Sequence, residues 1–518
     1  MKLDEGDNMK DEVKSSKNIK IAAILSYIII FINIAFGVLF IPLVIKTVGK
    51  SEYAIYTLVI SVIGLFSIDF GLGETIARYV AKYQSEKNNQ FQIDLINVII
   101  RIYFVITFLI VSLLLIVYGN IEYFYSGLSQ MEMEIFKSVF VLIIIYCATS
   151  VFFSPINGIL IGNEKFLFIK VTELINKSAF ILLTFYVLFI DPNIKYLIYA
   201  YMISGIVVIA IKIFYSLKSN LIVMNLAKLN RNLLKSVLTF SAWTMVILIS
   251  QRLMINLVPT YLAFWSNSSQ IALFSIAISI EGYIWTFSNA LNGLFLPKIT
   301  RLYNSGKHEE IEQLSIKVGR FQLVIMGLII IGFLSFGGEF IQLWIGKEYY
   351  NSWLIAFFLV ANGLITYTQI VPYTILFVNK KIKWHALSMI IAVLISSILA
   401  IILIPKFGAL GAGIAIFLGN FVGPSIISNV IYHKKIDFDI IKFLRAVYAK
   451  GIIPLTFAIF TGWLLNIFIS SVTIQNLLLK IVLFTIIYIV LMYLLYSTKK
   501  EKLVITKVLK FRWRNVDE

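Results

Sequence analysis

The chain has 518 residues, of which 59% are hydrophobic and 14% are charged, and its formal net charge is +18. Soluble globular domains have about 45–50% apolar and about 25% charged residues, so this composition excludes an ordinary soluble protein. Length and composition together predict a large protein embedded in a membrane, with surplus positive charge placed outside the hydrocarbon.

Apolar segments of about 20 residues or more recur along the whole sequence, and each is long enough to cross about 30 Å of hydrocarbon as an α-helix. There are fourteen such segments. In chain order they are 21–45, 54–79, 93–118, 135–161, 166–190, 194–217, 237–261, 270–297, 321–345, 351–378, 384–404, 408–432, 451–470 and 474–497. The sequence therefore predicts an all-α integral membrane protein with about 14 transmembrane helices.

No residue pattern indicates a processed leader or a reactive centre. The first segment is too long for the core of a signal peptide and continues through Pro42 without a small-residue cleavage site. The single cysteine, Cys147, lies inside the fourth segment, which excludes a disulfide framework and a cysteine metal site. The three histidines do not have the spacing of metal ligands, and no catalytic motif stands out. We therefore expect no metal site, no cofactor and no enzymatic activity.

The basic residues predict the orientation of the spans. With the amino terminus inside, every inside segment is basic, whereas the outside loops hold only five lysines: Lys46, Lys50, Lys195, Lys347 and Lys406. Cytoplasmic loops carry such an excess, so both termini are predicted to be cytoplasmic and the span number even. No folded basic domain is predicted, which excludes a nucleic-acid ligand. The basic run Lys499–Arg514 either contacts anionic membrane lipids or is a solvated tail.

A short repeat relates two halves of the chain. Ala54–Gly64 (AIYTLVISVIG) returns 218 positions later as Ala272–Gly282 (ALFSIAISIEG). An even number of spans precedes the second copy, so the halves have the same orientation, as in carriers that work by alternating access with the substrate site between the halves. The predicted architecture is two parallel-repeat six-helix lobes plus two C-terminal helices.

This architecture divides the chain into successive parts. They are a cytoplasmic tail 1–20, an N-lobe 21–217 of spans 1–6, a linker 218–236, a C-lobe 237–432 of spans 7–12, a cytoplasmic loop 433–450, spans 13–14 at 451–497 and a basic tail 498–518.

Polar and small residues form stripes on four repeat-related helices. The first span carries Ser26, Asn33 and Gly37; the second Thr57, Ser61, Gly64, Gly71 and Thr75; the seventh Ser241, Thr244, Gln251 or Arg252, and Pro259; the eighth Ser275, Ser279, Gly282, Thr286, Asn289 and Gly293. Small residues also let helix backbones approach closely, so each stripe indicates either helix packing or the wall of a hydrated cavity.

Charged residues inside the spans are further candidates for the wall of a binding cavity. Arg101, Lys137 and Lys480 are near span ends, where long side chains extend to the interface. Arg252 is some ten residues from either end of its span, and such a residue faces a bundle interior or an aqueous cavity. Lys170, Glu173 and Lys177 lie within a turn or two of one another and form either a neutralised structural cluster or a cavity wall.

Two acids are candidates for proton or ion coupling. Glu281 lies in the middle of its span, where the first repeat has Ile63, and Asp69 lies well inside the second span. Burial raises the pKa of a carboxyl group, which allows it to carry a proton. Pairing of Glu281 with Arg252 is the alternative, structural interpretation.

Three segments resemble a known family. Phe40–Tyr83 (FIPLVIKTVGKSEYAIYTLVISVIGLFSIDFGLGETIARYVAKY) resembles the opening of bacterial polysaccharide-export flippases, the O-antigen and lipid-linked oligosaccharide translocases. Leu296–Lys307 (LPKITRLYNSGK) and Leu403–Ile416 (LIPKFGALGAGIAI) also look like features of this family. The flippases belong to the multidrug/oligosaccharidyl-lipid/polysaccharide exporter superfamily, and the resemblance covers nearly the whole chain.

The resemblance implies a function and a site. The function is translocation of undecaprenyl-pyrophosphate-linked oligosaccharide from the cytoplasmic to the outer leaflet of the bacterial inner membrane, for O-antigen or capsule synthesis. A polysaccharide polymerase complex is a candidate partner. Arginine binds pyrophosphate bidentately, which makes Arg252 the first candidate. The further candidates for the central cavity are Lys177, Arg78, Asn33, Gln251 and Asn289.

Three alternatives stay open. A lipid II flippase and a cation-coupled multidrug exporter share the superfamily. A membrane polysaccharide polymerase or ligase is an enzyme of the same pathway. Such an enzyme usually has a large external loop, whereas the longest outside loop here, Gly119–Glu134, has about sixteen residues.

Overall fold

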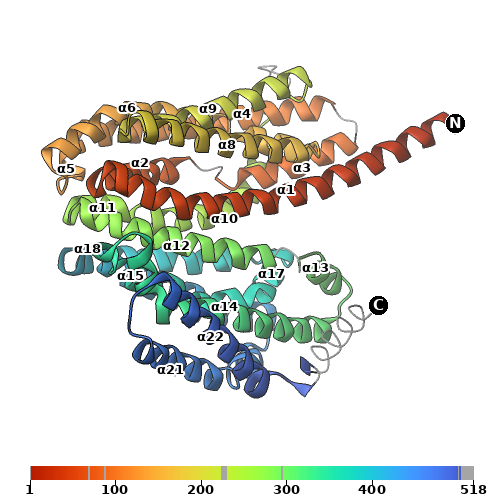
Figure 1. Cartoon of the computed structure of the whole chain (residues 1–518). Helices are drawn as coiled ribbons and strands as arrows, with labels where there is room; N and C mark the ends of the chain where they lie inside the picture. The colour runs from red at the N-terminus through yellow and green to blue at the C-terminus, as the bar shows by residue number, and fades with distance from the viewer. Residues whose placement is uncertain are drawn as a thin grey trace, which may run out of the picture. The chain divides into compact units, whose positions relative to one another are not determined.

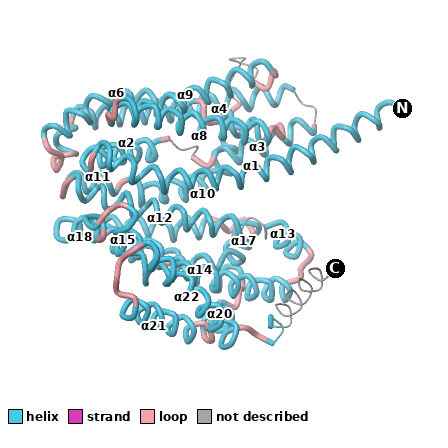
Figure 2. The backbone as a smooth tube through the Cα atoms, in the orientation of Figure 1, coloured by secondary structure: helices cyan, strands magenta, loops and turns pink. Residues whose placement is uncertain are grey.

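The computed structural model describes residues 2–67, 70–86, 89–222, 230–292, 296–499 and 501–502. Within these ranges the backbone is helical with short loops and contains no strand (Figure 2). The helices form two compact units, which are unit 1 (Met1–Ser275 with Ser397–Ala412) and unit 2 (Ile276–Ser396 with Gly413–Glu518). The lobe boundaries inferred from the sequence remain a prediction.

Unit 1 contains the first eleven helices and the start of the twelfth. They are α1 (Lys2–Val48), α2 (Lys50–Phe66), α3 (Leu72–Ser85), α4 (Asn89–Gly119), α5 (Ile121–Phe124), α6 (Gln130–Phe152), α7 (Pro155–Gly162), α8 (Phe166–Ile190), α9 (Ile194–Lys218), α10 (Arg231–Asn256), α11 (Val258–Trp265) and α12 (Ser268–Asn292). In this unit α4 packs on α6, α6 on α9 and α9 on α8, so these long helices run side by side (Figure 1).

Unit 2 contains the rest of α12 and the later helices, except for Ser397–Ala412 of α18, which belong to unit 1. They are α13 (Leu296–Asn304), α14 (His308–Trp344), η1 (Lys347–Tyr349), α15 (Ser352–Ala361), α16 (Gly363–Thr366), η2 (Tyr367–Gln369), α17 (Ile370–Val378), α18 (Lys383–Asn420), η3 (Phe421–Ile427), α19 (Ser428–Ile436), α20 (Ile440–Tyr448), α21 (Ile452–Phe468), α22 (Ile474–Leu491) and η4 (Met492–Tyr496). Helix α14 packs against α15, α17, α20, α21 and α22, and its buried Phe336 shares a core with Phe443, Phe484 and Tyr488.

Helix starts follow local sequence signals. The Ser129 hydroxyl accepts a hydrogen bond from the Glu132 amide, and the Glu132 carboxylate accepts one from the Ser129 amide, which together form a capping box at the start of α6. Asn193, Asn230 and Thr473 cap α9, α10 and α22 by accepting a backbone N–H in the same way. These caps satisfy backbone donors that the helix itself cannot pair.

Among the described residues, eleven helices are long and apolar enough to cross a membrane, and twelve if the bent pair α20 and α21 counts as one span. The predicted second span is divided into α2 and α3, which have 17 and 14 residues. The break ends at Phe70 and Gly71, which both have positive φ. The all-α, multi-span fold class is confirmed. The predicted second span forms two helices because the backbone changes direction at the positive-φ residues Phe70 and Gly71.

The predicted eleventh and twelfth spans form a helical hairpin. Gly408, with φ +55° and ψ −133°, interrupts α18. A Cβ on Gly411 would meet the Leu403 carbonyl oxygen, although eight residues of straight helix would separate these positions by about 12 Å. Farther along, Gly419 lies against Ala392. The 54-residue segment Lys383–Ile436 therefore doubles back and accounts for two predicted crossings.

The structure corrects the prediction for Lys480. Its side chain is fully buried, and its ammonium donates hydrogen bonds to Glu339 Oε1 at 2.5 Å and Asn466 Oδ1 at 3.1 Å. It does not extend to the interface, because a carboxylate partner on α14 stabilises its charge inside unit 2. Lys137, by contrast, pairs with the exposed Glu122 of α5 at 2.5 Å, as a residue near a span end should. The hydrogen bond from Lys137 and its positive charge lower the pKa of Glu122.

Candidate functional site

The polar cluster on α8 separates into an ion pair and a lysine without a carboxylate partner. The Lys170 ammonium lies 2.7 Å from Glu173 Oε2. The Lys177 ammonium instead lies 5.6 Å and 5.9 Å from the ring centroids of Phe36 and Phe180. Aromatic faces attract a cation but leave its hydrogen-bond donors available. Among the described residues, Lys177 has no acidic partner.

Lys177 borders an aromatic cluster in unit 1. We define this cluster as Phe36, Phe40, Tyr56, Tyr146, Phe180 and Tyr201, whose neighbouring ring centroids lie 5.3 to 6.0 Å apart. The rings come from α1, α2, α6, α8 and α9, so residues distant in sequence surround one apolar region. A cation beside such a region loses water contacts, which strengthens its attraction for an anion.

Arg252 lies at another edge of the same cluster. It is exposed on α10, and its guanidinium is near enough to the Tyr201 hydroxyl to act on it electrostatically. The Tyr201 and Phe180 ring centroids are 5.7 Å apart. Lys177 therefore lies near one ring of this pair and Arg252 near the other, and no carboxylate among the described residues forms an ion pair with Arg252. Two such cations can bind the oxygens of a phosphate group.

The stripes of the second and seventh spans meet each other within unit 1. The hydroxyls of Thr75 and Ser241 share a hydrogen bond of 2.6 Å. A Cβ on Gly71 would lie 3.0 Å from Thr244 Oγ1, and a Cβ on Gly64 would lie 3.0 Å from Asn256 Oδ1. These residues therefore serve helix packing, which is one of the two interpretations that the sequence left open.

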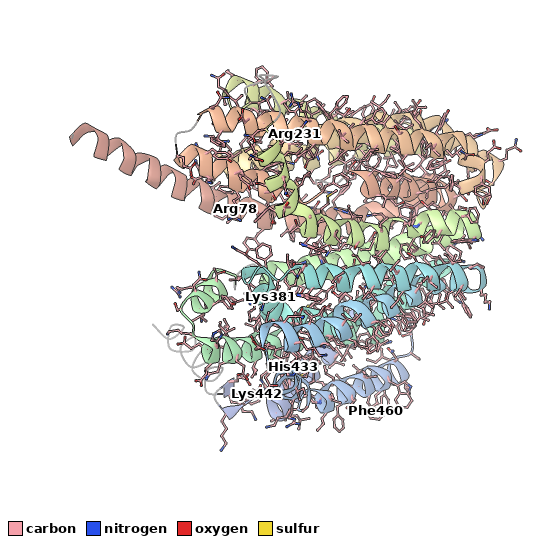
Figure 3. The ribbon with its side chains drawn as sticks, turned by 180° about the vertical axis from the view of Figure 1, so that it is seen from behind. Arg78, Arg231, Lys381, His433, Lys442 and Phe460 are labelled. Atoms are coloured by element: carbon pink, nitrogen blue, oxygen red, sulfur yellow. The ribbon has the colours of Figure 1, made fainter. Side chains whose placement is uncertain are left out.

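Arg78 lies beside this helix contact and not in the aromatic cluster. Its side chain is exposed on α3, with the guanidinium carbon 4.6 Å from the centroid of the Phe240 ring. Figure 3 shows Arg78 and Arg231 toward the same end of unit 1. Within unit 2, Lys381, His433 and Lys442 likewise lie toward one end, with Phe460 farther along (Figure 3). The orientation inferred from the basic residues remains a prediction.

The remaining predicted residues have varied environments. Asn33 on α1 is partly buried, whereas Gln251 on α10 and Asn289 on α12 are exposed. Glu281 is partly buried in unit 2, close enough to Tyr367 for an electrostatic interaction. It belongs to a different unit from Arg252, and Asp69 lies outside the described residues. The structure thus groups Lys177 with Arg252 in unit 1 and leaves the roles of the others as predictions.

Sequence reasoning missed two polar arrangements. Lys212, within the predicted sixth span 194–217, lies in α9 and donates a hydrogen bond to Asn157 Oδ1 at 2.9 Å. Arg320, assigned to a loop, is buried in α14 and pairs through Nε and an Nη atom with both Glu501 oxygens at 2.9 Å. Lys212 lies six residues before the end of α9, and this position inside the span could have identified it as a candidate. The partner of Arg320 could not be predicted, because Glu501 is 181 residues away in sequence.

The fold is that of a multi-span membrane transporter. The lipid II flippase MurJ in its inward closed conformation is similar over 93% of this chain and 99% of its own, with a TM-score of 0.64 and 17% identity. An inward-facing MATE multidrug transporter of the MOP superfamily is similar over 81% of this chain and 99% of its own, with a TM-score of 0.62 and 14% identity. The chain therefore has the fold of MOP-superfamily transporters, which confirms at the level of the fold the resemblance found in the sequence.

One curated relative is similar in sequence. The capsular polysaccharide biosynthesis protein CapF of Staphylococcus aureus is 32% identical over 156 residues, which are 29% of this chain. The match spans 37% of the length of CapF. No family model matches the chain.

Proposed function

We propose that this protein is a flippase that moves undecaprenyl-pyrophosphate-linked oligosaccharides from the cytoplasmic to the outer leaflet by alternating access. The grouping of Lys177 and Arg252 around an uncharged aromatic region is the observation that carries this proposal. The similarity to MurJ and to CapF supports a lipid-linked substrate for a surface polysaccharide.

The chemistry of the substrate explains the cations. Of the three parts of the proposed substrate, the pyrophosphate has a higher free-energy cost of transfer from water into an apolar medium than the sugars or the prenyl chain, because its charge must be desolvated. The Arg252 guanidinium can bind two phosphate oxygens at once, and the Lys177 ammonium supplies a compact second charge. The sugars would contact polar side chains such as Asn33 and Gln251, while the prenyl chain stays in lipid.

The proposed setting is the cytoplasmic membrane of a bacterium, with both termini in the cytoplasm. The even number of predicted spans and the basic inside segments support this orientation. Glu281 and Asp69 are proposed as coupling residues, because an acid within a span can bind and release a proton or a cation. Membrane lipids and a polysaccharide polymerase complex are proposed as neighbours. The protein acts without chemical catalysis and without a cofactor.

A cation-coupled exporter is the second candidate. The similarity to a MATE transporter favours it at the level of the fold. A partly buried acid, Glu281, would serve ion coupling in either function. The unpaired cations of unit 1 favour an anionic substrate, whereas an exporter of cationic drugs would repel its substrate at the same positions.

The test is genetic complementation of a strain that lacks this protein. Arg252→Ala should abolish surface polysaccharide while the protein inserts at normal levels, because a phosphate ligand is lost. Lys218→Ala removes an exposed base at the end of α9 and should leave the polymer unchanged. Normal polymer from Arg252→Ala would refute the role of Arg252. Drug resistance instead of polymer synthesis would favour the exporter.

A further inference from the structure

A polar cavity lies inside unit 1, apart from the aromatic cluster. Its volume is about 270 Å³, close to the lower end of the range for small-molecule sites, about 300–1,000 Å³. It forms where α2 ends, where α6 gives way to α7, and beside α9. Its polar lining consists of Ser67, Ser150, Ser154, Asn157 and Lys212.

The lining offers hydrogen-bond donors. Lys212 donates one of its three hydrogens to Asn157 Oδ1, which leaves the Asn157 amide hydrogens directed elsewhere. The Ser154 hydroxyl is buried without a hydrogen-bond partner among the described residues. A buried polar atom without a partner is costly, so such an atom beside a cavity indicates a bound group or water.

The other two serines complete the polar wall. Ser67 and Ser150 share a hydrogen bond of 2.8 Å, and Ser150 also donates to the Cys147 carbonyl at 3.2 Å. Since Ser150 gives its single proton to this carbonyl, Ser67 donates in the shared bond, and both hydroxyl protons are used within the wall. Neither serine brings a charge to the cavity.

The charge around the cavity is positive. Among the described lining residues, Lys212 is the one that carries a charge, and Glu173, the nearby acid that acts on Lys212, forms an ion pair with Lys170. The three side chains together carry one net positive charge. An ammonium, a primary amide and a hydroxyl, with no carboxylate among the described lining residues, suit a ligand that accepts hydrogen bonds and carries negative charge.

We propose that this cavity binds a phosphate-class oxyanion. Lys212 supplies the charge, Ser154 and Asn157 donate hydrogen bonds, and the Ser67–Ser150 pair closes the opposite wall. The ligand is either free phosphate or the phosphate of a lipid headgroup, since both present the same oxygens. This site is separate from Lys177 and Arg252, and its occupancy does not depend on the transport function proposed for them.

The experiment uses the full-length protein purified in a neutral detergent and titrated with inorganic phosphate. Binding to the native state should raise the thermal unfolding midpoint in a saturable way, because a ligand that binds only the folded protein stabilises it. Lys212→Gln should weaken binding by about tenfold or more, as expected for loss of a charged hydrogen-bond donor. Lys218→Gln, on the same helix but exposed, is the matched control and should bind like the wild type.

Two further measurements distinguish free phosphate from a lipid headgroup and control for misfolding of the Lys212 variant. Ser154→Ala removes one hydroxyl from the cavity and should weaken phosphate binding even if Lys212→Gln is poorly folded. Retention of phosphatidic acid through delipidation, lost in Lys212→Gln, without an effect of free phosphate would identify a lipid headgroup as the ligand. Absence of both effects, or equal binding by the Lys212 and Lys218 variants and by Ser154→Ala, would overturn the proposal.

Discussion

The cations within the spans of the two units have different partners. In unit 2, Lys480 contacts Glu339 and Asn466, and Arg320 contacts Glu501 and the Tyr496 and Ala446 carbonyls. In unit 1, Lys177 contacts the aromatic faces of Phe36 and Phe180, and neither Lys177 nor Arg252 has an acidic partner among the described residues. Paired cations connect helices, whereas unpaired cations retain the capacity to bind an anion.

Lys480→Met has the largest expected effect on stability. It leaves the Glu339 carboxylate without its cation, which costs about 3–5 kcal/mol for a buried pair. The same substitution at Lys177 removes no ion pair and should cost much less. Thermal unfolding of both variants in detergent measures the difference.

A double variant sharpens this comparison. Lys480→Met with Glu339→Leu replaces the pair by apolar side chains and should recover most of the lost stability. Equal destabilisation by Lys480→Met and Lys177→Met would break the distinction between paired and unpaired cations.

The Arg320–Glu501 pair predicts an acid-sensitive contribution to the stability of unit 2. Burial of Glu501 raises its pKa, but the hydrogen bonds from Arg320 and Thr498 and the charge of Arg320 together outweigh burial and lower the pKa below its ordinary value of 4.5. A carboxyl whose pKa is lower in the folded state contributes stability above its unfolded pKa, and this contribution is lost as the pH falls through the folded pKa.

The difference in unfolding midpoint between the wild type and Glu501→Gln should therefore be present at neutral pH and shrink below about pH 4.5. A difference that stays constant through this acid range would show that Glu501 is not held by Arg320. Arg252, which has no carboxylate partner among the described residues, should give no comparable acid-dependent difference in an Arg252→Gln variant.

Alanine substitutions at two equivalent glycines of the repeat should have the smallest effect on stability. Gly64 and Gly282 are equivalent in sequence, but a Cβ on Gly64 would lie 3.0 Å from Asn256 Oδ1, whereas a Cβ on Gly282 would meet none of the described atoms within 4 Å. Alanine is favoured over glycine within a helix by about 1 kcal/mol. Gly282→Ala should therefore raise the unfolding midpoint, and Gly64→Ala should raise it less or lower it. Equal shifts would show that the two helices are not packed differently at these positions.

Hydropathy predicted the helices because a span must be apolar along its whole length, and it failed where a helix is broken. The break before Gly71 depends on backbone conformation, which leaves the mean hydropathy of 54–79 unchanged. Charge in the middle of a span identified Lys177 and Arg252, because such residues are costly in lipid. Lys480 was misinterpreted because Glu339 is 141 residues away in sequence, and only the fold brings the two together.

Translocation of a fluorescent prenyl-pyrophosphate oligosaccharide by the purified protein in liposomes tests the central claim most directly. The wild type and Lys218→Ala should expose the substrate to an external quencher at the same rate. Lys177→Met and Arg252→Ala should each reduce this rate severely while their unfolding midpoints stay near that of the wild type. Wild-type rates from both variants would contradict the claim that the unpaired cations of unit 1 bind the pyrophosphate.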